Sequence, residues 1–345
     1  MKILHLLQSN RFSGAENVAC QIIDIMRAHP EYEIVYCSTD GPIREALQER
    51  NIRFAPIKKL SIKELRRVFA QEKPDVIHAH DRTAGFYAAL TCGKTKLIAH
   101  IHNSAFASQG ISLKSMLYLL AAWKAKHIFW VSSSACEGNR FHKLLKKKST
   151  VLQNIINVDA LYQRMALDEN VYNYDVVYLG RLACVKNPQR MMRILAKVLK
   201  QRPETKIAIV GQGELEAEVK SLAKTLAVAD KVAFLGFQSN PLKILHDAKA
   251  MLITSYREGF PMCMVESLAV GTPVVSTPID GVKERVEDGK NGFLSDEDDV
   301  LAARIIEILT NAELYEQLSA YAKKQSAEVN NAEEYCRKLI DAYGK

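Results

Sequence analysis

Two acidic residues eight positions apart, Glu258 and Glu266, flank a short glycine-containing loop. The loop follows a predicted strand and leads into an apolar helix, so it presents backbone N–H groups and a positive helix end to an anion. The first glutamate lies in the loop and the second at least a turn inside the helix. We expect them to contact two ends of one elongated ligand. Two solvent-facing glutamates beside an ordinary loop are the alternative.

Two cations, Arg181 and Lys186, follow another predicted strand and precede a helix that is predicted to open at Asn187-Pro188 with Asn as its N-cap. A guanidinium forks onto phosphate oxygens and an ammonium adds a compact charge, so the pair can balance a diphosphate without a metal ion. At about 4 Å and an effective dielectric near 20, each contact contributes roughly 4 kcal/mol before desolvation. Exposed cations at a strand end are the alternative.

A third element, 13–16, lies where the first strand turns into the first helix. Gly14 there could let a backbone amide approach a phosphate. The spacing of Ser13 and Glu16 also fits a capping box, which explains both residues without a ligand.

Two pairs of histidines, His78 with His80 and His100 with His102, alternate along strand ends, so each pair shares one face. A metal site is one interpretation. Because no third and fourth ligand stand at suitable spacing, we expect no metal and interpret His78, His80 and His100 as hydrogen-bonded core residues.

Strands and helices alternate along the chain in the pattern of parallel sheets with crossover helices. This predicts an α/β protein of two domains, with boundaries at 1–165 and 166–326 and a C-terminal helix at 327–345. The predicted strands are 2–7, 33–38, 76–80, 96–101, 128–132, 176–179, 206–210, 231–235, 250–254 and 273–276.

Charge is concentrated in the first half of the chain. The net charge of the chain is +8. The segment 82–148 alone holds 11 Lys and Arg residues and only one acidic residue, Glu137. This imbalance predicts an anionic partner. Apolar residues interleave with lysines at 113–126, a pattern that can lie on anionic lipid headgroups. Seven scattered cysteines without a Cys-x-x-Cys pair favour a cytoplasmic protein.

Taken together, these motifs resemble the retaining glycosyltransferases of family 4, of the bacterial cell-surface polysaccharide type. The resemblance runs from the first strand to about Leu309, and the order and spacing of the motifs are more specific than any one of them. The matching motifs are Asn154-Ile-Ile-Asn-Val-Asp, Gly180-Arg with Lys186-Asn, Val210-Gly-Gln-Gly, Glu258 with Glu266, and Ala269-Val-Gly-Thr-Pro-Val-Val.

The resemblance implies a GT-B fold, with two Rossmann-like domains whose parallel sheets face each other across a central cleft. It places the acceptor on the first domain and the sugar nucleotide on the second, with the C-terminal helix packing back on the first. It implies catalytic roles for Arg181 and Lys186 at the diphosphate and for Glu258 and His102 at the sugar. The implied nucleotide-sugar-binding residues are Gly14, Gly180, Gly211, Gly259, Phe260, Pro261, Met262, Cys263 and Glu266, the last at the ribose.

The implied reaction moves a hexosyl group, most often from a UDP-sugar, to an acceptor hydroxyl with retention of configuration. Neither a cofactor nor a metal ion is expected. The acceptor is a glycan or a lipid-linked molecule, and the basic first domain is expected to bind an anionic membrane on the inner face of the plasma membrane. The alternatives are a sugar-nucleotide epimerase and a non-enzymatic nucleic-acid binder. No recognised nucleic-acid motif supports the second.

Overall fold

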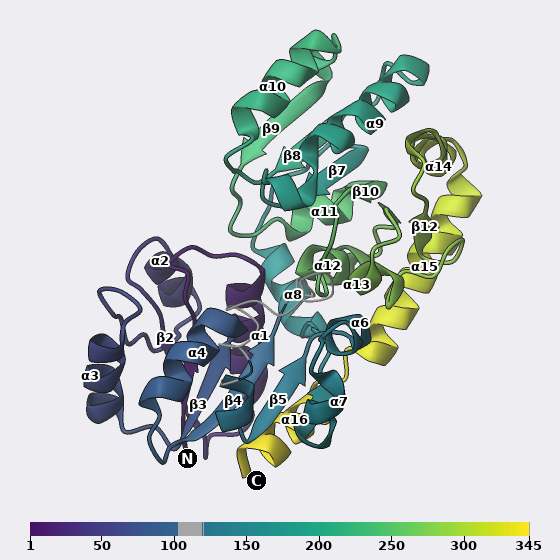
Figure 1. Cartoon of the computed structure of the whole chain (residues 1–345). Coiled ribbons are helices and arrows are strands. Elements are labelled where there is room, and N and C mark those ends of the chain that lie inside the picture. Colours follow the sequence, from purple (N-terminus) through teal and green to yellow (C-terminus); the bar gives the residue numbers. More distant parts are fainter. Residues whose placement is uncertain (103–118, 120, 345) are drawn as a thin grey trace. The chain divides into compact units, whose positions relative to one another are not determined.

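The computed structural model describes residues 1–102, 119 and 121–344, which divide into two compact units (Figure 1). Unit 1 comprises 1–155 with 331–345, and unit 2 comprises 156–330. The first division falls ten residues before the boundary that we predicted at 165/166. Helix α8 (Val158–Ala166) accounts for the difference, because it packs on α11 (Leu242–Asp247) and its Tyr162 hydroxyl donates to the carbonyl oxygen of Ala269 at 3.2 Å.

Unit 1 contains a six-stranded sheet in which every pairing is parallel, in the order β2-β1-β3-β4-β5-β6. The strands are short and apolar, as parallel strands covered on both faces must be. Their bounds are β1 (Lys2–Leu6), β2 (Glu33–Cys37), β3 (Val76–His80), β4 (Lys96–Ile101), β5 (His127–Trp130) and β6 (Ser149–Val151).

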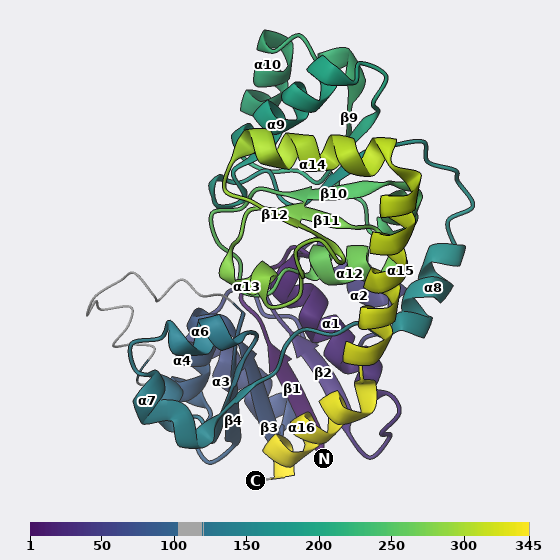
Figure 2. The same ribbon diagram turned by 90° about the vertical axis from the view of Figure 1, so that its right-hand side faces the viewer.

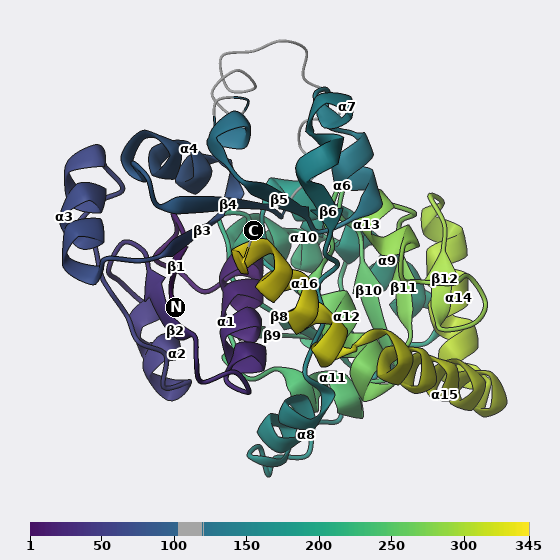
Figure 3. The ribbon, with the colours of Figure 1, turned by 90° about the horizontal axis from the view of Figure 1, so that it is seen from below.

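Helices cover both faces of this sheet. Apolar residues of α3 and α4 pack on the face that carries Leu4, Ile77 and Leu97. On the other face α16 lies beside α1, and the Cys336 thiol lies 3.8 Å from the carbonyl oxygen of Ile25 (Figure 3). The bounds are α1 (Gly14–Met26), α2 (Ile43–Glu49), α3 (Ile62–Glu72), α4 (Asp81–Thr91), α6 (Ser133–Glu137), α7 (His142–Leu145), η1 (Lys146–Lys148) and α16 (Ala332–Gly344).

Unit 2 repeats this architecture with a second parallel sheet, in the order β12-β11-β10-β7-β8-β9. Both orders reverse direction beside the first strand of the unit, the point where ligands bind in open parallel sheets. The strands are β7 (Val176–Leu179), β8 (Ile207–Val210), β9 (Val232–Gly236), β10 (Ala250–Ile253), β11 (Val274–Ser276) and β12 (Gly292–Leu294).

The main core of unit 2 lies between the sheet and helices α9, α10 and α14, and Figure 2 shows α14 along the β10 to β12 side. Helices α11 and α12 pack together, and α12 contacts both β11 and α15. The remaining bounds are η2 (Cys184–Lys186), α9 (Pro188–Gln201), α10 (Glu216–Thr225), η3 (Ala229–Lys231), α12 (Met262–Val270), α13 (Asp280–Lys283), α14 (Asp298–Thr310) and α15 (Ala312–Val329).

All ten predicted strands are present, and the structure adds the three-residue edge strands β6 and β12. The helix expected from residue 327 begins later. Helix α15 ends at Val329, and the side chain of Asn331 accepts the backbone N–H of Glu334 at 2.9 Å, so that α16 opens there. Tyr335, Leu339 and Ala342 of α16 are buried in unit 1.

Candidate functional site

The loops that follow β7 and β8 pack backbone against backbone in unit 2. The N–H of Gly180 donates to the carbonyl oxygen of Val210 at 2.9 Å, and the N–H of Gly211 donates to that of Gly236 at 2.7 Å. Gly211 has a φ of +131°, and a Cβ built there would lie 2.1 Å from the carbonyl oxygen of Gly180. Glycine is therefore required at position 211 both by backbone conformation and by space.

An ion pair joins the loop after β7 to the loop after β10. Lys186 Nζ lies 2.5 Å from Glu258 Oε1, and the hydroxyl of Ser255 donates to the same oxygen at 2.6 Å. The two charged side chains are 23% and 14% exposed. Burial opposes the charge on Lys186, but the Glu258 carboxylate outweighs it and raises the pKa of the lysine. Lys186 is therefore held as a cation at neutral pH.

Hydrogen bonds to backbone carbonyls fix the same two loops to each other. The hydroxyl of Thr254 donates to the carbonyl oxygens of Lys186 at 3.2 Å and Asn187 at 3.1 Å, and the N–H of Tyr256 donates to that of Val185 at 2.9 Å. Asn187 is the N-cap residue of α9, as predicted, but it has a left-handed φ of 50° and its side chain makes no capping bond. Pro188 does open α9, as predicted.

The loop 259–262 leads into α12, whose start at Pro261 has no side-chain cap. Gly259, Phe260, Pro261 and Met262 are all buried. The backbone carbonyl of Gly259 lies so close to Gly281 that a Cβ on Gly281 would come within 2.2 Å of its oxygen. The loop is thus held in one conformation with the helix start directly behind it.

Arg285 packs against the loop 259–262, and we did not identify it from the sequence. Its guanidinium carbon lies 5.3 Å from the centre of the Phe260 ring, and the residue is 6% exposed. Burial lowers the pKa of Arg285 to about 10, which leaves it charged at pH 7. Ser255 was also missed. Arg285 belongs to no recognisable motif, because it contacts a loop that is distant in sequence, whereas Ser255 lies only three residues before Glu258 in the same loop.

The remaining predicted residues of unit 2 differ in exposure. Glu266 lies inside α12 and is 7% exposed, as expected for the second glutamate. Burial raises the pKa of the Cys263 thiol to about 12, so it is neutral. Arg181 is exposed, forms no ion pair among the described residues, and its charge lowers the pKa of Lys186 slightly against the effect of Glu258.

Gly14 and His102 lie in unit 1. Gly14 is the exposed first residue of α1, with no atom within 4 Å of where a Cβ would be. The capping box predicted for Ser13 does not form. Its hydroxyl donates to the Glu16 carboxylate instead of accepting a backbone N–H, and burial raises the pKa of Glu16.

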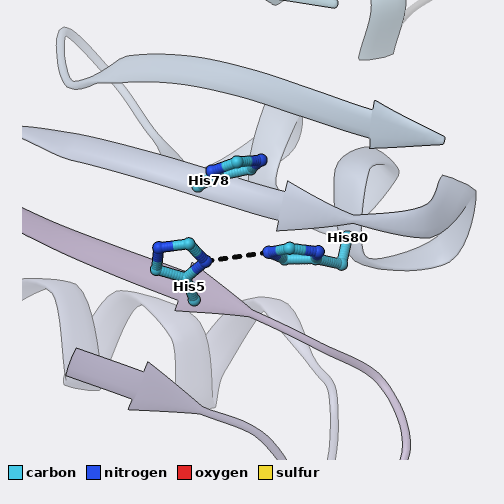
Figure 4. A group of neighbouring side chains, drawn as sticks. All are labelled: His5, His78 and His80. Atoms are coloured by element: carbon cyan, nitrogen blue, oxygen red, sulfur yellow. Dashed lines mark hydrogen bonds between the residues drawn. The ribbon is translucent and has the colours of Figure 1, made fainter. Parts of the chain in front are cut away.

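Five histidines gather on one face of the unit 1 sheet, because β1, β3 and β4 are neighbours there. Figure 4 shows three of them, His5, His78 and His80, with the hydrogen bond between His5 and His80. The predicted pairs His78 with His80 and His100 with His102 do share this face, and His5 joins them. Desolvation lowers the pKa of each of the five rings, that of His5 to about 3.

Two overlapping triads have ligand nitrogens within 4.8 Å of one another, and they share His80: His5, His78 and His80 form one, and His80, His100 and His102 form the other. Neutral imidazoles are ligands for zinc, copper and nickel. The sequence did not reveal this third partner for each pair, because nothing in it sets the strand order.

Two families match the chain in sequence. "Glycosyltransferase Family 4" matches residues 12–160, and "Glycosyl transferases group 1" matches residues 162–325. The chain belongs to the family 4 glycosyltransferases. Membership of this family favours the transferase over the epimerase and the nucleic-acid binder that we considered from sequence.

Among curated relatives, the chain is 25% identical over 216 residues to the N-acetyl-alpha-D-glucosaminyl L-malate synthase of Bacillus anthracis, an alignment that covers 59% of this chain and 55% of the relative. The chain spans only 52% to 57% of the length of this relative and of two further curated glycosyltransferases that it matches.

Two solved structures show the fold. Anabaena Alr3699/HepE in complex with UDP-glucose matches 100% of this chain and 99% of its own with a TM-score of 0.85 at 20% identity. S. aureus TarM, in complex with fondaparinux, alpha-GlcNAc-glycerol and UDP, matches 100% of both chains with a TM-score of 0.80 at 12% identity. The predicted GT-B fold is confirmed. Among the helices that the structure describes, none is both long and apolar enough to cross a membrane.

We predict that Gly211→Ala destabilises the protein by about 1–3 kcal/mol, because the new methyl group requires both a disfavoured φ and displacement of the Gly180 carbonyl. Urea unfolding would measure it. Gly289→Ala is the matched control, since Gly289 also has a positive φ, of +75°, but no atom within 4 Å. Equal losses in the two variants would show that the loop packing around Gly180 adds nothing.

Proposed function

We propose that this protein transfers a hexosyl group from a UDP-sugar to an acceptor hydroxyl with retention of anomeric configuration. The observation that carries the proposal is the Lys186 to Glu258 ion pair, which brings the predicted diphosphate and sugar residues together at one edge of the unit 2 sheet. Family membership and the UDP-glucose complex of the similar HepE structure support the choice of reaction and donor.

The donor's diphosphate would be held by charge that the chain itself supplies. Lys186 is a fixed cation, Arg181 is exposed beside it, and the start of α12, the positive end of its dipole, has no side-chain cap. Because these groups are held in place before the ligand arrives, they stabilise negative charge without reorganisation. We therefore propose that the nucleotide binds without a metal ion or cofactor.

The two glutamates would contact opposite ends of the donor. Glu258 Oε1 is occupied by Lys186 and Ser255, which fixes the orientation of the carboxylate, and we assign Oε2 to a hydroxyl of the sugar. Glu266, inside α12, is assigned to the ribose hydroxyls, as the family resemblance implies. The resemblance further assigns Gly14 and His102 of unit 1 to the diphosphate and the sugar.

In the proposed reaction the bond between the anomeric carbon and the leaving phosphate oxygen breaks, and the acceptor oxygen bonds to the same face of that carbon. The acceptor's proton passes to the departing phosphate, so no separate protein base is needed. Negative charge grows on the diphosphate as it leaves. Arg181, Lys186 and the α12 start are placed to stabilise that charge.

Removing either cation should cost most of the activity. We expect Arg181→Ala and Lys186→Ala each to lower turnover by about 100- to 1,000-fold, the usual effect of losing one preorganised charge. UDP should raise the melting temperature of the parent protein in the presence of EDTA. Lys197→Ala, which removes a surface lysine paired with Asp299, is the control and should stay near parental activity. Losses below threefold in both variants, or strict dependence of UDP binding on added metal, would contradict the assignment.

Replacing each of the two glutamates should impair a different property of the protein. Glu266→Gln should weaken binding of UDP itself, because it loses a charge-assisted bond to the ribose. Glu258→Gln should leave UDP binding within about threefold, because its amide oxygen can still accept the hydrogen bonds from Lys186 and Ser255, while lowering kcat/KM for the UDP-sugar, because the sugar loses the carboxylate. Calorimetry with UDP, alongside donor kinetics, separates the two. If both variants lost UDP binding equally, the division into sugar and ribose ends would be wrong.

A basic and apolar surface on unit 1 supports the further proposal of peripheral membrane binding. Trp123 is 76% exposed and Leu144 is 77% exposed. Lys148 Nζ donates to the carbonyl oxygens of Trp123 and Ala125, at 2.9 Å each, which ties η1 to the residues around the tryptophan. We call this the Trp123 surface; its exposed cations are Lys124, Lys126, Arg140, Lys143, Lys146 and Lys147.

The structure changes which residues should make the contact. Of the segment 113–126, residues 113–118 and 120 lie outside the described part of the chain, and Leu119 is half-buried. Leu144, which we had not singled out, is exposed. We propose that the Trp123 surface binds anionic lipid headgroups on the inner face of the plasma membrane, near a glycan or lipid-linked acceptor.

We predict that replacing Lys143, Lys146 and Lys147 together by Gln weakens binding to acidic vesicles by roughly 100-fold, at about 1 kcal/mol for each lysine. Lys148 is left intact because of its structural hydrogen bonds. Vesicle flotation at physiological salt measures the change. Lys58, Lys59 and Lys63 replaced by Gln are the control, since these exposed lysines lie on unit 1 outside the Trp123 surface. Equal release by both triple variants would indicate net charge alone, and no parental binding would assign the surface to a soluble anion.

A further inference from the structure

Three histidines of unit 1 form a continuous hydrogen-bonded chain. His5 Nδ1 lies 2.9 Å from His80 Nε2, and His80 Nδ1 lies 2.8 Å from His102 Nε2. The chain runs across β1, β3 and the end of β4, from the fully buried His5 to the half-buried His102. Figure 4 shows its first link. His102 is the end that can meet a ligand.

A neutral imidazole carries one proton, so each ring can donate one ring hydrogen bond and accept one. Each link of the chain needs one proton, and His80 sits in both links. If His80 carries its proton on Nδ1, then His5 must be protonated on Nδ1 and His102 also on Nδ1. If His80 is protonated on Nε2, then His5 and His102 must also be protonated on Nε2. The three tautomers therefore change together or not at all.

The inner end of the chain decides between the two arrangements. His5 Nε2 is buried and has no hydrogen-bond partner among the described residues. In the first arrangement this atom is a bare lone pair, whereas in the second it is a buried N–H without an acceptor. Buried backbone N–H groups are almost always paired whereas under-satisfied backbone acceptors are less rare, and we apply the same preference to the ring nitrogens. The first arrangement is therefore favoured, with all three protons on Nδ1.

We infer that His5 and His80 are positioning residues that fix His102 in its Nδ1–H tautomer, so that it meets the donor as a hydrogen-bond donor through Nδ1. The inference rests on the proposed function for the identity of the ligand, but the tautomer itself does not depend on it. The backbone N–H of His102 also approaches the Asp81 carboxylate at 3.4 Å, which holds the backbone beside the ring.

The geometry favours this chain over a metal centre. Two nitrogens bound to one zinc ion stand at about 2.0–2.1 Å from it, which puts them more than 3 Å apart in a tetrahedral site. The nitrogens of both links are closer than that. No carboxylate contacts the inner rings of the chain among the described residues, so a dication there would lack a compensating charge.

The direct test is nitrogen NMR of the ligand-free protein labelled with ¹⁵N in its histidines. Long-range proton correlations distinguish a protonated from a bare ring nitrogen. We expect Nδ1 to be the protonated nitrogen in His5, His80 and His102 at pH 7.5. Protonation of His102 on Nε2, or a mixture of both forms in the parent protein, would overturn the inference. So would a stoichiometric metal ion that survives EDTA and shifts these signals.

Variants test the coupling. His80→Phe removes both links while keeping a ring of similar shape, and should release His102 into a mixture of tautomers. His78→Phe is the matched control, because His78 stacks on His80 at 4.6 Å but bonds to Tyr343 outside the chain. His102 should keep its tautomer there. An unchanged His102 signal in His80→Phe, or an equal change in both variants, would refute the coupling.

Kinetics separates failure of this inference from failure of the proposed function. If both the inference and the proposed function are correct, His80→Phe lowers kcat/KM for the UDP-sugar about tenfold, the effect of weakening one hydrogen bond, while the affinity for UDP stays within twofold. If the protein uses no UDP-sugar but the NMR result stands, only the proposed function falls. If the parent enzyme is active and His80→Phe matches His78→Phe in both kcat/KM and His102 signals, only the positioning role falls.

Discussion

The ion pair between Lys186 and Glu258 is the contact on which the arrangement of unit 2 depends. Charges that are mostly removed from water must be paired, and losing one partner of such a pair leaves the other uncompensated, at a cost of about 3–5 kcal/mol when burial is complete. The chain meets this constraint by bringing the loop after β7 and the loop after β10 together. The hydroxyl of Thr254 bonds to the carbonyl oxygen of Lys186 across the two loops, and the hydroxyl of Ser255 bonds to Glu258 within its own loop. The pair thus fixes the positions of these two loops relative to each other.

Close backbone packing is the second constraint at the same edge. A Cβ at Gly213 or Gly281 would come within 2.2 Å of a neighbouring carbonyl oxygen, as it would at Gly211. Gly211 and Gly213 let the loop after β8 approach the loop after β7, and Gly281 lets α13 approach the loop after β10, more closely than side chains would permit. Loops that are packed this closely cannot shift easily, and a hydrogen-bond donor that is already in place costs little to use.

The sequence predicted most of the fold, because the strands are β-branched or apolar runs separated by helical segments and these patterns depend on local residues alone. It missed β6 and β12, since three-residue edge strands hold too few residues to show a pattern. Asn330 and Asn331 did carry a signal for the break between α15 and α16, as Asn331 is followed by Glu334 at capping distance, but we read the segment as one helix. The candidate residues of unit 2 could be named from the sequence because they lie in motifs, and the structure brings two of them, Lys186 and Glu258, together. Arg285 could not, since only the fold brings it to Phe260, and the partnership of His5 with His80 required knowing that β1 lies beside β3.

The buried histidines should make the stability of unit 1 more sensitive to acid than the stability of unit 2. An unfolded histidine has a pKa near 6.5, whereas folding lowers the pKa of His5 to about 3 and that of its neighbours below the usual value. Above pH 6.5 both states are neutral and nothing is lost. Below it the unfolded chain takes up protons that the folded chain does not, so each buried histidine removes up to about 1.4 kcal/mol of stability per pH unit. Unit 2 contains a single histidine, His246, which is partly exposed. Mild acidification should therefore lower the stability of unit 1 through its histidines more than that of unit 2.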